Sequence, residues 1–229
     1  MDRLRSLALS LTLALLTAAP SLPAAAEPQP PPFSRGSLVG WKTETFEGRP
    51  QTKYSLVDDG GVQVLHAVCD DSVLGLVWRG RVDLTRTPIL SWRWKIQRVY
   101  PGADPHTKAG DDFPARVYVA LGTAWLPWTL RSLSYTWANG PLASGRHAAG
   151  GVPFIPSPYT DRAELLAVRQ GAAGVGQWQA ESRDVRADLK AVFGDDYDHI
   201  DGVAVMTDCD DSHTHGQAWY GDLRFSAAP

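Results

Sequence analysis

The stretch that decides the expected fold is Gly202-Val-Ala-Val-Met-Thr-Asp-Cys-Asp-Asp-Ser-His-Thr-His-Gly-Gln-Ala-Trp-Tyr-Gly-Asp-Leu-Arg-Phe225. Its two ends, Val203–Thr207 and Ala218–Phe225, have the apolar and aromatic content of β-strands. The segment between them is crowded with Asp and His, and Asp is a common turn residue. The stretch therefore predicts a closing hairpin of two strands with a polar loop between them.

Similar short runs recur upstream of this stretch. Tyr54–Val57 and Val62–Val68 flank Asp58-Asp59-Gly60-Gly61, which predicts a hairpin because glycine accepts a positive φ at no steric cost. Leu90–Ile96 alternates between apolar and polar side chains, as in a strand with one buried face. Further runs of this kind are Val73–Trp78, Ala115–Leu121, Ser132–Trp137, Ala163–Arg169 and Trp178–Arg183.

One segment has helical spacing instead. Asp184–Phe193 places its apolar side chains on one stripe, with Asp184 as the N-cap and Gly194 beyond the end. A second segment, Asp161–Gly171, fits either a strand or a short helix. Many short strands separated by turns, with one late helix at about 184–193, predict an all-β fold: a single antiparallel β-sandwich.

The first residues have the composition of a secretory signal peptide. Arg3 and Arg5 precede the apolar run Leu7–Ala19, and Ala24-Ala25-Ala26 supplies a small-residue cleavage site. The apolar run is shorter than the roughly 20 residues that a membrane-spanning helix needs. We therefore expect residues 1–26 to be removed, with no stable membrane insertion afterwards and a periplasmic or secreted product. A Pro-rich linker over 27–35 and a β-sandwich domain over 36–229 would follow.

Charge and cysteine content limit the partners and the compartment. The formal net charge is −3 and no basic block is present, which excludes nucleic acid and anionic membrane surfaces as partners. We expect a monomer. The two cysteines, Cys69 and Cys209, either form a disulfide that closes a long loop or remain separate thiols.

Aromatic side chains beside charged ones suggest a ligand site. Nine Trp and seven Tyr favour strands, and such rings either stack on sugars or fill the core. The runs around Arg116 and Tyr135 each present aromatic side chains on one face, and the guanidinium brings a fixed set of donors. If that face is exposed it suits a sugar; in the opposite orientation the rings are core. The predicted ligand-binding residues are Lys95, Asp111, Asp112, Arg116, Tyr118, Tyr135, Trp137 and Asp208.

The Asp-rich loop also raises the question of a metal. Carboxylate oxygens suit Ca²⁺, and the set that would hold a structural calcium ion is Asp208, Asp210, Asp211 and Asp222. The spacing lacks the glycine and distal glutamate of an EF-hand, so a solvated Asp-rich turn is the alternative. His213 and His215 could add a zinc or copper site, but no third strong ligand is spaced to match.

Catalysis would need two carboxylates across a scissile bond. A glycoside hydrolase holds them about 5–9.5 Å apart. If the protein is an enzyme, the candidates are Asp111 or Asp112 together with Glu181. The sequence has no Gly-x-Ser-x-Gly elbow, phosphate loop or dinucleotide fingerprint, and no cofactor is required by any pattern in it.

Several motifs together resemble a known family. They are Leu90–Lys95, Lys108–Val119, Leu133–Asn139, Ser157–Arg162, Met206–Asp210 and Tyr220–Phe225. In this order they resemble the exported bacterial family catalogued as domain of unknown function 3047, from roughly Phe46 to Phe225. The strand layout is also similar to galactose-binding-like jelly rolls, which many carbohydrate-binding modules use and which often hold a structural calcium ion. Cys209, His213 and His215 depart from the family pattern.

The resemblance implies a jelly-roll sandwich with a carbohydrate ligand. Together with the aromatic, Arg and Asp residues, it predicts an exported, non-catalytic protein that binds a carbohydrate or similar polar polymer. A polysaccharide hydrolase or lyase on the same scaffold is one alternative. A structural envelope protein without a ligand, with every aromatic side chain in the core, is the other.

Overall fold

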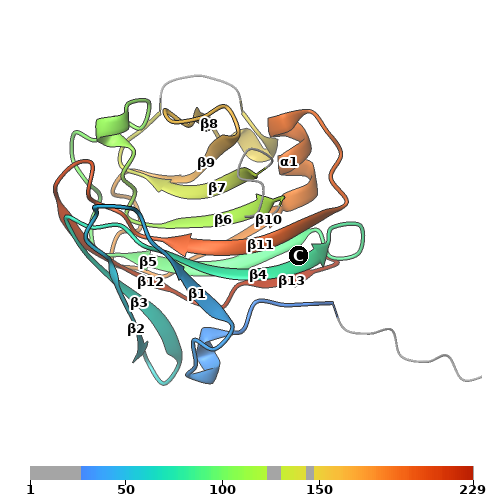
Figure 1. The fold of residues 1–229 in the computed structure, drawn as a ribbon, viewed down its shortest axis with the longest axis horizontal. Coiled ribbons are helices and arrows are strands. Elements are labelled where there is room, and N and C mark those ends of the chain that lie inside the picture. Colours follow the sequence, from blue (N-terminus) through green and yellow to red (C-terminus); the bar gives the residue numbers. More distant parts are fainter. Residues whose placement is uncertain (1–26, 123–129, 143–146, 229) are drawn as a thin grey trace, which may run out of the picture.

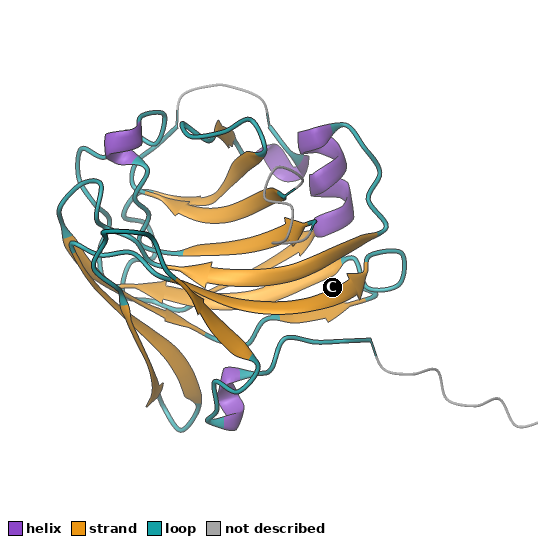
Figure 2. Ribbon diagram, in the orientation of Figure 1, coloured by secondary structure: helices purple, strands orange, loops and turns teal. Residues whose placement is uncertain are grey.

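A computed structural model describes residues 27–122, 130–142 and 147–228, which form two curved β-sheets packed face to face (Figures 1 and 2). In spatial order, sheet A contains β1 (Trp41–Glu44), β4 (Gly75–Asp83), β11 (His199–Met206), β6 (Arg116–Leu121), β7 (Arg131–Ala138), β9 (Ala163–Gln170) and β8 (Phe154–Pro156). Sheet B contains β10 (Gln179–Asp184), β5 (Ile89–Ile96), β12 (His215–Tyr220), β3 (Gln63–Asp70) and β2 (Lys53–Asp58), and β13 (Arg224–Ser226) also pairs with β5.

This architecture confirms the predicted β-sandwich of jelly-roll type. The described strands pair in antiparallel fashion except β7 and β9, which run parallel. A parallel pair needs a long crossover; here the crossover runs from residue 139 to residue 162 and includes β8. The hairpin predicted around Asp58–Gly61 is present as β2 and β3. The ambiguous segment Asp161–Gly171 forms strand β9 rather than a helix.

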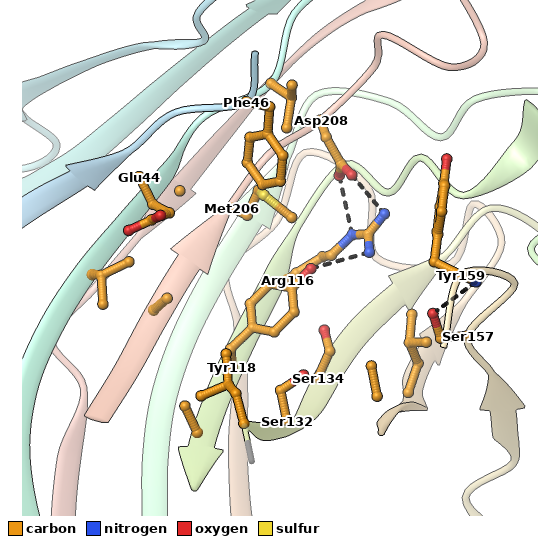
Figure 3. A pocket seen from close by; sticks show the side chains of 18 of the residues that line it. Glu44, Phe46, Arg116, Tyr118, Ser132, Ser134, Ser157, Tyr159, Met206 and Asp208 are labelled. Carbon is orange, nitrogen blue, oxygen red and sulfur yellow. Dashed lines mark hydrogen bonds and ion pairs between the residues drawn. The ribbon is translucent and has the colours of Figure 1, made fainter. Parts of the chain in front are cut away.

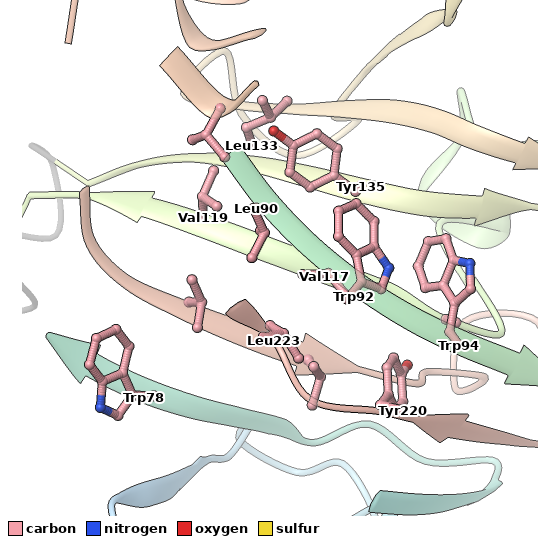
Figure 4. Close-up of a cluster of buried hydrophobic side chains, with 14 of the residues drawn as sticks. Trp78, Leu90, Trp92, Trp94, Val117, Val119, Leu133, Tyr135, Tyr220 and Leu223 are labelled. Carbon is pink, nitrogen blue, oxygen red and sulfur yellow. The ribbon is translucent and has the colours of Figure 1, made fainter. Parts of the chain in front are cut away.

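Aromatic side chains from both sheets meet in the core (Figure 4). Trp92 and Trp94 point inward from β5, as the alternation of that strand predicts. Trp92 packs on Tyr135 with ring centroids 5.2 Å apart, and Trp94 packs on Trp137 at 6.0 Å. Large aromatic rings bury more apolar surface than any other side chains, so these contacts hold the sheets together.

The predicted closing hairpin is wrong. β11 lies in the middle of sheet A and β12 in the middle of sheet B, so the two strands face each other across the core instead of pairing. Each strand has an apolar face, and the sandwich buries both faces against each other. The intervening loop crosses from one sheet to the other. A disulfide between Cys69 of β3 and Cys209 of this loop, with an S–S distance of 2.02 Å, ties it to sheet B.

The one α-helix among the described residues is the predicted one. α1 spans Val185–Phe193; the side chain of Asp184 accepts a hydrogen bond from the Ala187 amide at 2.9 Å, and Gly194 ends the helix with a φ of 82°. Beneath it Asp188 is buried and accepts hydrogen bonds from Arg183 and from the hydroxyl of Tyr135. The helix therefore covers the sandwich beside β7 and β10.

The N-terminal segment 27–35, expected as a linker, packs against the sandwich. Phe33 lies in a short 3₁₀ helix (Phe33–Arg35), is fully buried, and stacks on Trp41 at 4.9 Å. Gln29 exchanges two hydrogen bonds with the backbone of Phe225. The predicted signal peptide, residues 1–26, lies outside the described residues. Within the described ranges, no helix has the length and apolar content that crossing a bilayer requires.

Candidate functional site

The outer face of sheet A is hollowed into a groove of about 920 Å³ (Figure 3). Strand register places small side chains side by side on its floor. One row across four neighbouring strands is Gly202, Ala120, Ser132 and Ala163, and the adjacent row is Ala204, Tyr118, Ser134 and Leu165. Alternate residues of the same strands, including Val117 and Val119, point into the core. The groove therefore exists because most outward positions of adjacent strands lack bulk, with Tyr118 and Leu165 as the exceptions.

Gly202 is required by the backbone as well as by the groove. A Cβ atom at this position would lie 2.6 Å from the carbonyl oxygen of Trp78 on β4. The register between β11 and β4 shifts between Ile200 and Gly202, which brings the two backbones together there. Glycine allows such a close approach because it has no side chain.

A buried ion pair forms one end of the groove. The guanidinium of Arg116 donates to both carboxylate oxygens of Asp208, at 3.1 and 2.5 Å, and to the hydroxyl of Tyr118 at 3.1 Å. It also donates to the backbone oxygen of Asp111. Burial alone would lower the pKa of Arg116, but attraction to Asp208 and Tyr118 holds it well above its ordinary value. Burial raises the pKa of Asp208, and the charge of Arg116 opposes that rise.

The loop that follows β11 is held in place from two sides. The Cys69–Cys209 disulfide and the hydroxyl of Thr52, which donates to the Thr207 oxygen at 2.9 Å, fix it to sheet B. On the other side the fully buried carboxylate of Asp112 accepts hydrogen bonds from the amide and hydroxyl of Ser212, both at 2.5 Å. Asp112 therefore fixes this loop in place and uses its carboxylate in doing so.

The side walls of the groove carry two exposed aromatic rings and many charges. Phe46, after β1, is 44% exposed, and Tyr159, before β9, is 51% exposed. Lining arginines are Arg49, Arg79 and Arg116. Lining carboxylates are Glu44, Glu47, Asp111, Glu164, Asp201, Asp208, Asp210 and Asp211. Carboxylates thus outnumber guanidinium groups by eight to three, which gives the groove a negative lining.

Asp111 differs from the other lining carboxylates in its surroundings. It is 9% exposed, and its Oδ1 atom lies 3.5 Å from Arg116 Nη2 but accepts no hydrogen bond. Burial raises its pKa, with a further rise from Asp211 and an opposing effect of Arg116. The hydroxyl of Ser134, also in the groove lining, likewise has no hydrogen-bond partner among the described residues.

The structure brings half of the predicted ligand-binding set together. Arg116, Tyr118, Asp111 and Asp208 line the groove. Tyr135 and the fully buried Trp137 point to the opposite side of sheet A, into the core. The reason is register: Tyr135 lies opposite Val117 on β6, so both share the inner face.

The remaining predicted residues lie elsewhere. Lys95 is on the outer face of sheet B, where its ammonium group lies 2.7 Å from Asp59 and 4.6 Å from the ring of Trp219. Glu181, on β10, accepts hydrogen bonds from Trp94 at 3.0 Å and from Arg169 at 2.6 Å. Of the suggested catalytic partners, Asp111 therefore lies in the loop before β6 of sheet A, whereas Glu181 lies on β10 of sheet B.

The suggested metal ligands have other partners. Asp222 accepts two hydrogen bonds from Ser34, while Asp210 and Asp211 pair with Arg49. Across the described residues no group of three or more His, Cys, Asp or Glu side chains is arranged to hold a metal ion. His213 contacts Asp71 and His215 contacts Arg98. Calcium binding stays a prediction.

Neither wall aromatic was predicted from the sequence as a site residue. Phe46 and Tyr159 each stand alone in an irregular segment, so no strand alternation identifies them. The available signal was the isolation of Tyr159 in a polar Ser, Pro and Thr segment, since a large ring in such a loop must either pack or stay exposed.

The chain is similar to one protein family and to several solved β-sandwich structures. A family model described as "Protein of unknown function (DUF3047)" matches residues 39–224. No curated protein matches the chain. Among solved structures, the cellulose-induced protein Cip1 has a TM-score of 0.46 at 11% identity, covering 84% of this chain and 93% of that one. Endoglucanase 3 of Trichoderma harzianum, from family GH12, has a TM-score of 0.45 at 8% identity, with 82% and 91% covered.

A third similar structure is TmCBM61 in complex with β-1,4-galactotriose. Its TM-score is 0.38 at 9% identity, covering 85% of this chain and 93% of that chain. All three TM-scores lie below 0.5, so the function is inferred below from the side chains of the groove alone.

Proposed function

This chain belongs to the DUF3047 family of proteins of unknown function, and we propose that it binds a neutral saccharide chain in the groove on sheet A, without cleaving it. The observation that carries the proposal is the floor of small residues across β11, β6, β7 and β9. A solvent-facing sheet surface is ordinarily covered by long polar side chains. Here Gly, Ala and Ser leave a volume that a chain of sugar rings can fill.

The groups around this floor suit sugars. The exposed rings of Phe46 and Tyr159 can stack on the apolar faces of pyranose units. The hydroxyl of Ser132 and the guanidinium of Arg79 offer hydrogen bonds to sugar hydroxyls. An apolar lining with a few convergent polar groups is typical of small-ligand sites.

Charge supports a neutral ligand over an anionic one. Eight carboxylates against three arginines line the groove, and all three arginines already pair with carboxylates: Arg116 with Asp208, Arg49 with Asp210 and Asp211, and Arg79 with Glu44. A polyanion such as a uronic acid polymer would meet like charge and lose affinity.

The absence of cleavage is supported by where the suggested catalytic residues lie. Asp112 is buried and engaged with Ser212, and Glu181 is on the other sheet. One observation favours the alternative of a polysaccharide hydrolase: Asp111 is a groove carboxyl whose raised pKa would suit a general acid. Release of reducing ends from neutral polysaccharides, lost in Asp111→Asn, would establish that alternative.

We also propose that the protein is exported. The signal-like composition of residues 1–26 supports this, as does the Cys69–Cys209 disulfide, because disulfides persist in oxidising compartments. Fractionation of cells that produce the full chain, with the N-terminus of the product sequenced, tests it. A product that keeps residue 1 and stays in the cytoplasm would contradict export.

The binding proposal is tested on an array of neutral and anionic glycans. We expect the wild type to bind neutral oligosaccharides and not uronic acid polymers. Tyr159→Ala should lose about tenfold or more in affinity, because removing the ring beneath a stacked nucleobase costs about 1–3 kcal/mol and we expect a similar cost for a stacked sugar. Val62→Ala, which truncates an exposed side chain beside the β2–β3 turn, is the matched control. No binding by wild type to any glycan would overturn the proposal.

A further inference from the structure

At the end of the groove formed by the Arg116–Asp208 ion pair, side chains from both edges of sheet A meet. We call this network the bridge. Arg49 follows β1, which is one edge strand, and Tyr159 precedes β9 and follows β8, which is the other edge strand. Both meet at Asp211, in the loop after the central strand β11. Arg49 Nη2 lies 3.1 Å and the Tyr159 hydroxyl 2.7 Å from the carboxylate oxygens of Asp211.

Further contacts reinforce this bridge. Arg49 Nη1 lies 3.2 Å from Asp210 Oδ2 and also donates to the Asp210 backbone oxygen at 3.3 Å. The ammonium group of Lys108 lies 5.1 Å from the centre of the Tyr159 ring, and the Tyr159 hydroxyl contacts the Lys108 oxygen at 3.4 Å. The bridge is therefore a network and not a single surface contact.

The support of the bridge is rigid. Asp211 lies two residues beyond Cys209, whose disulfide fixes the loop to β3, and its amide together with Ser212 is held by the buried carboxylate of Asp112. Beneath it lies the buried Arg116–Asp208 pair, with side-chain exposures of 5% and 6%. A loop anchored by a disulfide and by a buried carboxylate cannot easily swing aside to let a polymer pass.

From this geometry we infer that the groove recognises the end of a saccharide chain and not an internal stretch. The inference rests on the function proposed above and names the part of the ligand that the site takes. A polymer that lies along the direction of the strands must stop at the Arg49–Asp211–Tyr159 bridge, so its terminal unit faces Asp111, Arg116 and Asp208. A groove without such a bridge would let the polymer continue beyond the C-terminal end of β11.

The experiment uses the protein as cells produce it and a panel of neutral polysaccharides: β-glucan, mannan, galactan and xylan, each in a short and a long fraction of equal mass. If only ends bind, the protein bound per gram at saturation falls in inverse proportion to chain length. Asp211→Ala, which removes both halves of the bridge, should make the bound amount independent of length. Tyr159→Phe keeps the ring and removes the hydroxyl, so the amount of protein bound per gram should depend on chain length less than in wild type and more than in Asp211→Ala.

The outcomes distinguish end recognition from saccharide binding itself. The matched control is Asp196→Ala, which should behave as wild type. Asp196 is an exposed carboxylate that follows α1 and pairs with Arg186 of that helix. Wild-type binding per gram that is equal for short and long fractions would overturn end recognition and leave saccharide binding intact. No binding to any member of the panel would overturn both. Thermal melting of Asp211→Ala confirms that the variant is folded; if it is not, Tyr159→Phe carries the comparison.

Discussion

At the scale of single residues, the most consequential feature is the burial of Arg116 and Asp208. The sequence suggested both as site residues with the orientation of the Arg116 face left open, and both line the groove. The pairing itself was beyond the sequence because the two residues are 92 positions apart, and only the β11–β6 register brings them together. The prediction that Tyr135 and Trp137 face the ligand failed for a related reason. Alternation shows which residues share a face, but it does not show which face is buried.

The first prediction concerns this pair. Arg116→Leu should destabilise the fold by about 3–5 kcal/mol, because it leaves the Asp208 carboxylate buried without its partner. Urea unfolding measures the change. The double variant Arg116→Leu/Asp208→Leu should regain much of the loss, since the uncompensated charge is gone. A double variant as unstable as the single one would contradict this account.

A second prediction concerns Asp111 and pH. Burial raises the pKa of this carboxyl, so the folded state holds the proton more tightly than the unfolded state. Its contribution to stability is therefore greatest at acidic pH and is lost as the pH rises through the folded-state pKa. Relative to wild type, Asp111→Asn should gain stability as the pH rises from acidic to neutral. Melting curves across that range would refute this if the difference were constant or had the opposite sign.

At the scale of secondary-structure elements, local patterns predicted strands better than their partners. β5 matches the predicted strand Leu90–Ile96 to within one residue, and α1 matches its predicted cap and stop, because alternation and capping are local. The predicted closing hairpin failed because pairing is non-local, and a strand with one apolar face can serve either sheet. The predicted strand Ala218–Phe225 is also interrupted after Tyr220, where Gly221 passes so close to Arg93 that a Cβ would lie 2.6 Å from its side chain.

The third prediction concerns the element that joins the two sheets. The Cys69–Cys209 disulfide has a sequence separation of 140 residues. Replacing both cysteines with serine should destabilise the protein by up to about 5 kcal/mol in the chain-entropy model. It should also weaken ligand binding, because the loop that carries Asp210 and Asp211 loses its anchor. Unfolding and binding titrations of the double variant test both parts, and an unchanged unfolding free energy would contradict the first.

At the scale of the whole molecule, the two outer faces of the sandwich differ. On sheet B the side chains of Trp178, Lys95, Trp219 and His66 stack in sequence: the Lys95 ammonium lies 5.1 and 4.6 Å from the two indole rings, and His66 stacks on Trp219 at 4.8 Å. Lys95 and His66 flank Trp219 from neighbouring strands, so both faces of that ring are covered. Sheet A instead presents the groove with its small-residue floor. The groove on sheet A is therefore the proposed ligand site.

The measurement that tests this assignment most directly is a calorimetric titration. A neutral oligosaccharide that the wild type binds on the glycan array is titrated into three proteins: wild type, Ala204→Trp and Trp219→Ala. Ala204 lies on the groove floor, and a tryptophan there fills the groove while leaving the core untouched. We predict that Ala204→Trp melts like wild type but no longer binds, whereas Trp219→Ala still binds. Retained binding by Ala204→Trp, with loss in Trp219→Ala, would contradict the central claim.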